Sequence, residues 1–425
     1  MARRKLSVFL YGKLVGELTG DGTLIQGFRY RSGYVGPILS HSLPTTRRSA
    51  SRQAASTWFN GLLPEGRELR LAMAQAHDSR NTTPMGLLEN AGLDCAGAVQ
   101  LTPDAELSER LGSFESIDER EIGLRLRAAL RGQPVTEFSE RWSVAGQQGK
   151  LALHRTEDGR WARALDGLPT THIVKPGIAF VGRDAVEDQA LMEHITLAAA
   201  RAIGIDAALT EFHEFDGVPA VVVQRYDRIR IEGVVQRIHQ EDFCQALGVR
   251  TENKYEDQGG PGVRQIARML DEVAGDSSQS FSERVSFARM AIFNYLIGNP
   301  DAHAKNYSLL ILPDGSTSLA PMYDAASGLG YSVAGTVELR FPRAAMKVGF
   351  EDAFFGVTER DWRQFARDLA LPYEVVAGER NRIVEELPDA LRTVLDEEAP
   401  STARKRILAS PLLGRVQENT STALI

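Results

Sequence analysis

The segment Asn299-Pro-Asp-Ala-His-Ala-Lys-Asn306 and the residues on either side of it constrain the fold of this chain more than any other feature. An apolar run with helical spacing, Phe281 to Ile297, leads into the segment. Behind it come Y-S-L-L-I-L, the turn sequence P-D-G and S-T-S-L-A-P-M-Y-D, which together predict a β-hairpin that ends at Asp324. A helix, a charged loop and a returning hairpin therefore place Asp301, Asn306 and Asp324 in one region.

Asp301 and Asn306 have the D-x-x-x-x-N spacing of a phosphoryl-transfer loop. In such loops the aspartate accepts the proton of the attacking hydroxyl, and the asparagine holds a magnesium ion. A second metal-binding aspartate follows a short hairpin, and Asp324 stands at that place. The triplet that begins at Asp324 is D-A-A rather than D-F-G, so we expect no phenylalanine-driven switch. Because a chain of this length contains about one D-x-x-x-x-N by chance, the prediction depends on the hairpin context.

Lys175 and Glu193 extend this site upstream. Lys175 ends the apolar strand T-H-I-V-K, and Glu193 lies eighteen residues later on a predicted helix. A lysine at such a place grips the α- and β-phosphates of ATP, and the glutamate fixes its ammonium group. Either residue alone is more simply interpreted as a solvated charge. Their order ahead of Asp301, Asn306 and Asp324 favours a nucleotide site.

A glycine-containing loop precedes the lysine, where a phosphate-covering loop belongs. Backbone N–H groups of such a loop can cradle phosphate oxygens. Gly146 and Gly149 are too close for a Walker A loop, and Leu151 replaces the Ser or Thr that such a loop needs, so a P-loop ATPase is disfavoured. We expect this loop to contact the nucleotide through Ser143, Val144, Ala145, Gly146, Gln147 and Lys150.

Gln224-Arg225-Tyr226 follows the apolar run V-V-V, at the position of a hinge between two lobes. Backbone groups of Gln224 and Tyr226 are expected to hydrogen-bond the adenine there. This expectation rests on position alone.

Charge and cysteine content exclude several classes of protein. The net charge of -7 argues against a protein that coats nucleic acid by itself, because that affinity comes mainly from Lys and Arg. Cys95 and Cys244 lie outside any C-x-x-C pattern, so neither a disulfide framework nor a thiolate zinc site is expected. The apolar run Leu6 to Leu10 is too short for a signal peptide, and no stretch approaches the ~18 apolar residues of a membrane span. We expect a cytoplasmic protein with no membrane contact.

At 425 residues the chain is too long for one ordinary core. Strand patterns around one helix, followed by mainly helical patterns, predict an α+β chain with a protein-kinase-like two-lobed fold. An additional α/β subdomain precedes the lobes, and the C-terminal lobe is mainly helical. The predicted parts are an N-terminal subdomain (1–110), a connection (111–138), a small-lobe-like region (139–235), a helical large lobe (236–415) and a tail (416–425).

Several elements within these parts can be placed. Gly12-Lys13 marks a hairpin, and residues 54–76 have a helical pattern with a break at Pro64. In the small lobe a helix from about Ala185 to Ile203 ends at Gly204. In the large lobe helices are predicted at 263–274, 281–297, 359–369 and 373–395, the last interrupted at Pro388, before a loose tail at 417–425.

These segments together resemble the HipA family, the kinase toxins of bacterial type II toxin-antitoxin modules. The resemblance runs from G-K-L-V-G-E-L near residue 12, through F-N-G-L-L-P-E at 59–65, to the large lobe, and so covers most of the chain. The most specific matches are S-V-A-G-Q-Q-G-K, T-H-I-V-K, Q-R-Y-D-R, H-Q-E-D-F-C-Q-A-L-G, K-Y-E-D-Q-G-G-P-G, D-A-H-A-K-N and P-M-Y-D.

The resemblance implies a serine/threonine protein kinase that uses ATP and Mg²⁺. Carried over position by position, Lys175 would bind the ATP phosphates and Glu193 would orient that lysine. Asp301 would be the catalytic base, and Asn306 and Asp324 would hold magnesium.

Two further residues gain a role from the resemblance. His303 would sit beside the nucleotide. Ser143 matches the serine that family members autophosphorylate, which ejects the loop and silences the kinase. The family's A-Q-E-K is Gln147-Gln-Gly-Lys150 here, so the loop loses a carboxylate and gains a flexible glycine. Gln224 stands where glutamate is common.

The resemblance also implies partners. A helix-turn-helix antitoxin of the HipB kind would supply DNA binding. Direct DNA contact by this chain would be minor, because the basic residues around Arg367 are only partly retained and Ala370 occupies a second position. Family targets are aminoacyl-tRNA synthetases, with glutamyl-tRNA synthetase the leading expectation, although the sequence carries no substrate code.

Two other functions stay open on the sequence alone. A catalytically weak kinase-fold subunit could bind the antitoxin and act as a co-repressor, but intact Lys175, Asp301, Asn306 and Asp324 argue against it. A small-molecule kinase of related fold is disfavoured by the N-terminal extension and by the loop that carries Ser143.

Overall fold

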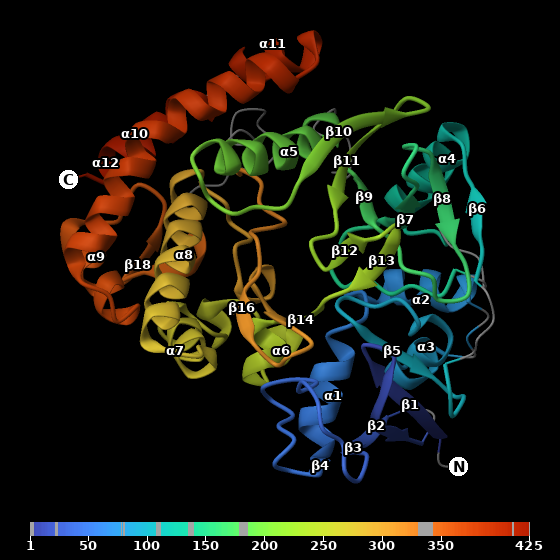
Figure 1. The fold of residues 1–425 in the computed structure, drawn as a ribbon. Helices are drawn as coiled ribbons and strands as arrows, with labels where there is room; N and C mark the ends of the chain where they lie inside the picture. Colours follow the sequence, from blue (N-terminus) through green and yellow to red (C-terminus); the bar gives the residue numbers. More distant parts are fainter. Residues whose placement is uncertain are drawn as a thin grey trace.

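The computed structural model describes residues 4–21, 24–77, 79, 81–107, 112–134, 140–177, 186–329, 343–409 and 412–424. Within these residues we call 4–107 the N-terminal domain, 112–237 the small lobe and 239–424 the large lobe (Figure 1). The small lobe is built on a sheet and the large lobe mainly of helices. The predicted α+β class and two-lobed arrangement are confirmed.

The N-terminal domain is a five-stranded antiparallel sheet, in the order β4-β3-β2-β1-β5, covered by helices. Its elements are β1 (Arg4–Leu10), β2 (Lys13–Gly20), β3 (Ile25–Tyr30), β4 (Ser49–Ala50), β5 (Val99–Thr102), α1 (Arg52–Asn60), α2 (Arg67–Ala76) and α3 (Pro84–Ala91). The hairpin predicted at Gly12 is confirmed. Tyr11 and Gly12 have φ of 51° and 73°, as a two-residue turn between twisted strands requires. The predicted helical stretch breaks at Pro64 into α1 and α2, as expected.

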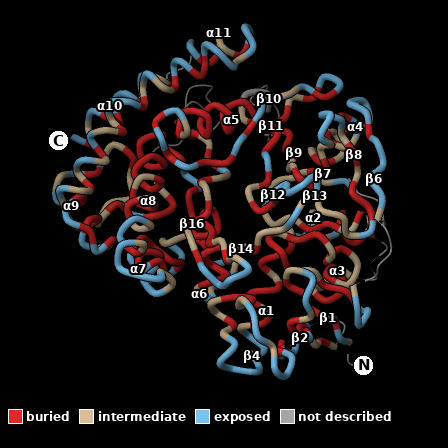
Figure 2. The backbone as a smooth tube through the Cα atoms, viewed as in Figure 1, coloured by how far each residue is buried: buried red, intermediate tan, exposed pale blue. Residues whose placement is uncertain are grey.

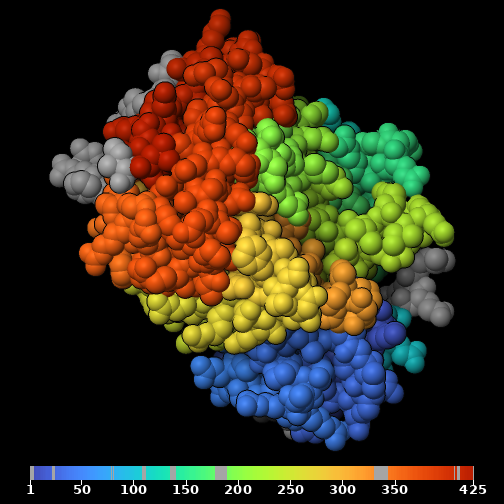
Figure 3. All heavy atoms as spheres, turned by 60° about the vertical axis from the view of Figure 1, so that its left-hand side comes forward, coloured from blue at the N-terminus to red at the C-terminus, as the bar shows by residue number. Residues whose placement is uncertain are grey.

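Aromatic side chains fill the core of the N-terminal domain and tie it to the large lobe. Phe28, Trp58 and Phe59 are buried. The Trp58 indole N–H donates to Glu241 Oε2 at 3.0 Å, across the boundary with the large lobe. Figure 3 shows the N-terminal domain (blue) directly against the large lobe (yellow) on one face. Because a buried indole N–H needs a partner, docking of the two parts satisfies a group that neither part satisfies alone.

The small lobe is a six-stranded sheet in the order β10-β11-β9-β7-β8-β6. Its elements are β6 (Phe114–Ser116), α4 (Glu119–Leu130), β7 (Leu151–Arg155), β8 (Trp161–Ala164), β9 (His172–Pro176), α5 (Val186–Ala202), β10 (Thr210–Phe215), β11 (Val218–Gln224) and the hairpin β12 (Arg228–Ile231) with β13 (Val234–Arg237). Alternate residues of β11 face opposite ways. Ala220 and Val222 pack with α4, and Val221 and Val223 pack with α5. Coverage of both faces explains why this strand is an unbroken apolar run.

One expectation for the small lobe needs correction. The predicted connection, 111–138, contributes the edge strand β6 and the covering helix α4, so its described part belongs to the small-lobe sheet. The polar surface of α4 hid its apolar stripe, which includes Ile122 and Leu126. The segment from Ser143 to Lys150 precedes β7 as a loop, as predicted. Helix α5 closes near Gly204, φ 75°, as predicted, while Ala185 lies outside the described residues.

The large lobe surrounds a three-stranded antiparallel sheet in the order β14-β15-β16. Its elements are β14 (His239–Asp242), α6 (Phe243–Leu247), α7 (Val263–Val273), α8 (Ser277–Leu296), β15 (Ser308–Ile311), β16 (Thr317–Leu319), β17 (Arg343–Val348), β18 (Glu351–Ala353), α9 (Glu359–Asp368), α10 (Tyr373–Glu398), α11 (Ser401–Ala409) and α12 (Leu412–Thr422), with short 3-10 turns at Thr251–Asn253, Glu256–Gln258 and Ala304–Asn306. Among the helices of the described residues, none is both long and apolar enough to cross a membrane.

Helix α8 and the hairpin β15–β16 lie on either side of the segment Asn299 to Asn306. The Asp276 side chain caps α8 by accepting the Gln279 N–H at 2.8 Å. The second half of α8 is buried (Figure 2), which fixes where the following loop begins. The hairpin predicted behind the loop is confirmed, and its turn closes where the Leu312 N–H donates to the Ser316 carbonyl at 2.8 Å.

Helix α10 continues through Pro388, so the predicted interruption is wrong. A proline removes one backbone N–H and opposes helix locally. Buried Leu387 and Leu391 anchor the helix on both sides of Pro388, so packing against the large lobe outweighs that local penalty.

The predicted loose tail is also wrong for its described residues, which form most of α12. Asn419 is fully buried and anchors this helix. Its Nδ2 donates to the carbonyls of Tyr295 at 2.8 Å and Leu296 at 3.1 Å, and its Oδ1 accepts the Phe355 N–H at 3.0 Å. The Tyr295 carbonyl also accepts the Gly298 N–H at 3.0 Å, whereas the Leu296 carbonyl lies in the last turn of α8, has no partner in the helix, and receives one from Asn419.

Asn419→Ala should lower the free energy of unfolding by about 2–3 kcal/mol, because it leaves buried backbone groups unsatisfied. Urea denaturation followed by circular dichroism measures this. The adjacent exposed Glu418→Ala should change stability by less than about 0.5 kcal/mol. Equal stability of the two variants would contradict the role assigned to Asn419.

Candidate active site

A buried lysine between two carboxylates links the two lobes. Lys175 Nζ, at the end of β9, lies 2.5 Å from Glu193 Oε1 of α5 and 2.9 Å from Asp324 Oδ1, which follows β16. Lys175 and Glu193 are buried, while the Asp324 side chain is 44% exposed. The predicted pairing of Lys175 with Glu193 is therefore present in the geometry, and Asp324 joins it from the large lobe.

The charges in this group shift one another's pKa. Burial alone would lower the pKa of Lys175, but the Asp324 and Glu193 carboxylates outweigh burial and raise it. The Lys175 ammonium holds the pKa of Asp324 well below its ordinary value. Burial raises the pKa of Glu193, and Lys175 offsets part of that effect. The cleft therefore keeps an anionic aspartate beside a cationic lysine.

The loop after α8 is held in shape by its own side chains. The Asp301 N–H donates to Asn299 Oδ1 at 3.0 Å, and Asn306 Nδ2 donates to the Asp301 carbonyl at 2.7 Å. His303 Nε2 lies 3.5 Å from Asp301 Oδ1. Burial lowers the pKa of His303 to about 3, so its imidazole is neutral. The D-x-x-x-x-N spacing thus corresponds to a loop in which the asparagine fixes the backbone of the aspartate.

Asp324 reaches the same region with a strained backbone. Its φ is 55°, a left-handed conformation that aspartate adopts at a cost. The neighbouring Tyr323 donates its hydroxyl to the Lys305 carbonyl at 2.7 Å, which ties the end of the hairpin to the loop. Lys305 in turn pairs with Asp242 at 2.6 Å.

A cleft of ≈ 550 Å³ lies between the lobes, and most of the predicted site residues line it. It also touches the N-terminal domain, through Glu65 among others. The predicted residues that line it are Val144, Ala145, Gly146, Gln147, Lys150, Lys175, Gln224, Tyr226, Asp301, His303, Asn306 and Asp324. Glu193 stays behind Lys175, as expected of a residue that orients it.

Hydrogen bonds hold the glycine-containing loop, residues 143–150, over the cleft. Lys150 Nζ donates to the Ala145 carbonyl at 2.7 Å, and burial lowers the Lys150 pKa to about 8. Gly146 has φ 119°, and a Cβ there would lie 2.5 Å from Lys150 Nζ, so only glycine suits this position. The Glu65 N–H donates to the Gly146 carbonyl at 2.8 Å, which fastens the loop to the N-terminal domain.

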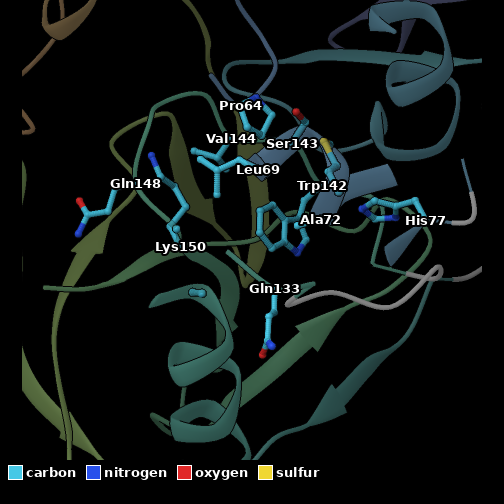
Figure 4. A pocket seen from close by; sticks show the side chains of 13 residues that line it. Pro64, Leu69, Ala72, His77, Gln133, Trp142, Ser143, Val144, Gln148 and Lys150 are labelled. Atoms are coloured by element: carbon cyan, nitrogen blue, oxygen red, sulfur yellow. The ribbon is translucent and has the colours of Figure 1, made fainter. Parts of the chain in front are cut away.

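Ser143 does not line this cleft, unlike the other loop residues predicted to contact the nucleotide. The buried Ser143 hydroxyl donates to the Leu62 carbonyl at 2.8 Å, and the Ser143 N–H donates to the Asp94 carbonyl at 3.0 Å. Figure 4 shows Ser143 with Trp142 and Leu69 around a smaller cavity of ≈ 60 Å³, which shares Leu69, Val144 and Lys150 with the cleft. The N-terminal domain therefore supplies the partners of both polar groups of this serine.

Sequence reasoning missed the network behind Gln224 and Tyr226. Asp94 Oδ1 accepts from Arg228 Nη2 at 2.9 Å, and Asp227 Oδ2 accepts the Gly97 N–H at 2.7 Å and Arg225 Nη2 at 2.8 Å. All four charged side chains are buried. Burial would raise the pKa of Asp227, but the Arg225 and Arg228 guanidinium groups outweigh it and hold that pKa well below its ordinary value. The Q-R-Y-D-R motif was the available signal, but its partner Asp94 lies in the N-terminal domain.

Tyr255 was also missed. Its hydroxyl donates to Asp301 Oδ1, and its ring meets His303 edge-on with centroids 4.9 Å apart. Lys254 beside it pairs with Glu65 at 2.8 Å. The motif K-Y-E-D-Q-G-G-P-G flagged this segment, but nothing in the sequence connects it to Asp301.

Asn306 and Asp324 suit a magnesium ion carried with a nucleotide. Both line the cleft, and the Asn306 amide nitrogen is used by the Asp301 carbonyl, so the amide oxygen is the atom available for a cation. Mg²⁺ takes one or two such protein oxygens together with phosphate oxygens and water. The described residues contain no cluster of three or more His, Cys, Asp or Glu that could hold a metal without the nucleotide.

Comparison with family models matches both halves of the chain. The model described as HipA N-terminal domain matches residues 6–102. The model described as HipA-like C-terminal domain matches residues 142–394.

Individual proteins give the same result. Y4mE of Sinorhizobium fredii, named as a candidate kinase, is 35% identical across 98% of this chain and 99% of its own length. The serine/threonine-protein kinase toxin HipA of Shewanella oneidensis is 29% identical across 92% of this chain and 89% of its own. The solved complex of Shewanella oneidensis HipA, HipB and operator DNA contains a chain that superimposes with a TM-score of 0.79 at 24% identity, over 99% of this chain and 97% of that one. This structural likeness shows the fold.

Lys175→Met should lower the free energy of unfolding by about 3 kcal/mol, because it leaves the buried Glu193 carboxylate unpaired. Without Lys175 the folded variant holds the Glu193 proton to higher pH than the unfolded chain does. The loss of stability should therefore widen between about pH 5 and about pH 8. Urea denaturation at the two pH values measures both effects.

The control for this prediction is Lys5→Met, which removes an exposed pair with Glu17 of 3.0 Å and should cost less than about 1 kcal/mol. Lys175→Met with Glu193→Leu should recover most of the lost stability. A double variant no more stable than Lys175→Met would show that burial of an unpaired charge is not the cause.

Proposed function

The chain belongs to the HipA family of serine/threonine-protein kinases, and on that premise we propose that it transfers the γ-phosphoryl group of ATP to a serine of a protein and acts as a growth-inhibiting toxin. The observation that carries this proposal is the convergence of Lys175, Asp301, Asn306 and Asp324 on one cleft, with Glu193 paired to Lys175 behind it. The same convergence argues against a subunit that only binds an antitoxin.

Each residue of the cleft has its own role in phosphoryl transfer. Lys175, oriented by Glu193, holds the α- and β-phosphates. Asn306 and Asp324 would hold a magnesium ion, which would offset the negative charge of the phosphates. Asp301 takes the proton of the acceptor hydroxyl as that oxygen attacks the γ-phosphorus. Because little covalent chemistry is needed, positioning and charge do most of the catalysis.

The adenine lies against the hinge. Gln224 and Tyr226 line the cleft, and the Gln224 N–H already donates to the Leu209 carbonyl at 2.8 Å. Adenine recognition at Gln224 therefore uses the carbonyl, which glutamine and glutamate share. The replacement of the family's glutamate at this position should change little.

Ser143 is the proposed site of autophosphorylation and self-silencing. Its hydroxyl is bonded to Leu62 and buried, so phosphorylation requires the loop to leave the N-terminal domain. A phosphoserine could not return to that site, because a dianion beside the Leu62 carbonyl would be buried and unpaired. Modification of Ser143 would thus hold the glycine loop away from the cleft.

The proposed partners are a HipB-like helix-turn-helix antitoxin and a translation enzyme. One structural neighbour is a HipA in complex with HipB and operator DNA, which supports the first. DNA contact by this chain is indirect or minor. An aminoacyl-tRNA synthetase, with glutamyl-tRNA synthetase foremost, is the proposed acceptor. Phosphoproteomics of cells that briefly express the chain would identify the acceptor serine directly.

Purified protein with Mg-ATP should gain phosphate on Ser143, and Asp301→Ala should reduce the rate at least about 100-fold, because it removes the base that takes the hydroxyl proton. Mass spectrometry of the intact chain and of its peptides measures this. Arg392→Gln, on the exposed side of α10, is a control that should incorporate phosphate normally. Full incorporation by Asp301→Ala would refute the base assignment.

Ser143→Ala should remain toxic on induction, or become more toxic, because the kinase can no longer silence itself. Growth curves after induction measure this, with Asp301→Ala as the non-toxic control. A folded Ser143→Ala that binds ATP yet leaves growth unaffected would rule out the proposed switch.

A further inference from the structure

Tyr255 occupies the place at Asp301 where an acceptor hydroxyl must stand. A kinase acceptor is a hydroxyl whose proton points at the catalytic aspartate. The Tyr255 hydroxyl donates to Asp301 Oδ1 in the same way, and Tyr255 belongs to the kinase chain itself. Tyr255 is therefore in the position of an intramolecular stand-in for the acceptor.

The backbone that carries Tyr255 is fixed. The Gly260 N–H donates to the Tyr255 carbonyl at 2.8 Å, and a Cβ at Gly260 would lie 2.2 Å from the Asn253 carbonyl oxygen. Lys254 pairs with Glu65 on one side of Tyr255. With the backbone fixed, release of Asp301 requires only rotation of the Tyr255 side chain, which is partly exposed.

A groove leads from Tyr255 to the outer surface, between α1 and the start of α2 on one side and residues 250–258 on the other. Two adjoining hollows of ≈ 560 and ≈ 430 Å³ form it, and they share Ser56, Asn60 and Arg250. The inner hollow shares Glu65 and Lys254 with the interlobe cleft. The groove therefore adjoins the cleft that holds the catalytic aspartate, and Tyr255, which lines the inner hollow, bonds to that aspartate.

We propose that the protein acceptor enters through this groove as an extended segment, and that Tyr255 holds the place of its serine hydroxyl until it arrives. This inference rests on the proposed function and adds to it the route and the class of the acceptor. The two hollows together are larger than a small hydroxyl compound needs. Arrival of the acceptor rotates Tyr255 away, after which the serine oxygen bonds to the γ-phosphorus, the bond to the ADP oxygen breaks and the proton passes to Asp301.

The chemistry of the groove suits a polypeptide main chain. Arg52, Arg67 and Arg250 are exposed along it. Guanidinium groups only donate hydrogen bonds, so their natural partners are carbonyl and carboxylate oxygens. Nucleic-acid phosphates are also acceptors, but the groove ends at a hydroxyl-binding aspartate rather than at a basic surface. A peptide that carries the acceptor is therefore favoured over RNA.

Tyr255→Phe should raise ATP hydrolysis without acceptor by about three- to tenfold, because water then reaches the Asp301 carboxylate, and it should lower the peptide KM by a similar factor. The probe is a degenerate library of 15-residue peptides with one central serine, used with saturating Mg-ATP. A lower kcat with unchanged hydrolysis and unchanged KM would make Tyr255 a mere support for Asp301. Phosphate on Tyr255 in the wild-type protein would make it an acceptor, and either result overturns its place-holding role.

Arg67→Gln with Arg250→Gln should raise the peptide KM about tenfold and leave kcat and the KM for ATP unchanged. Arg392→Gln is the matched control. The rate of phosphorylation of free N-acetylserine amide should be the same in the wild-type protein, the double variant and Arg392→Gln. Unchanged peptide KM, or a loss of RNA binding instead, would overturn the groove assignment.

Failure of the proposed function gives a different result. A wild-type protein that neither binds ATP nor autophosphorylates would remove the kinase proposal itself. A wild-type protein that autophosphorylates but transfers nothing to peptides would overturn only the inference of an extended polypeptide acceptor.

Discussion

The Lys175 ammonium, buried between Glu193 and Asp324, is the interaction on which the rest of the site depends. Its two partners come from different lobes, so the cleft has its working shape only when β9, α5 and the end of the β15–β16 hairpin are in register. Taking these charges out of water is costly, and only their close mutual contacts offset that cost. Under the proposed function, a nucleotide that binds there would exchange one set of anionic partners for another, and the lysine would already be placed for phosphate.

Spacing in the sequence predicted that candidate residues close to one another along the chain lie together. Asp301 and Asn306 lie on one short loop, and a hairpin with the turn sequence P-D-G brings Asp324 next to that loop. Lys175 and Glu193 lie on an adjacent strand and helix. Contacts across domains could not be predicted in this way. Asp94 meets Arg228, Leu62 accepts from Ser143, and Tyr255 reaches Asp301, and each pair is far apart along the chain.

The wrong predictions about the fold have a shared physical cause. Pro388 and the segment around Asn419 were judged by local propensity, which disfavours helix at the first and order at the second. Tertiary contacts determine the structure at both places. Buried leucines keep the helix intact beside Pro388, and three hydrogen bonds hold Asn419 in place. Helix α4 was overlooked because its apolar stripe is narrow among charged residues, and only the sheet beneath it reveals what the stripe contacts.

Because Ser143 is buried, the rate of its modification depends on how often the loop opens. Any reaction at its hydroxyl must wait for the loop to part from Leu62, Asp94 and Glu65, so the rate of opening, and not the chemistry, sets the upper limit on how fast that reaction can proceed. Such local openings are rare and random in each molecule. A population of these proteins would therefore lose the loop contact one molecule at a time, over a spread of waiting times set by the stability of three contacts with the N-terminal domain.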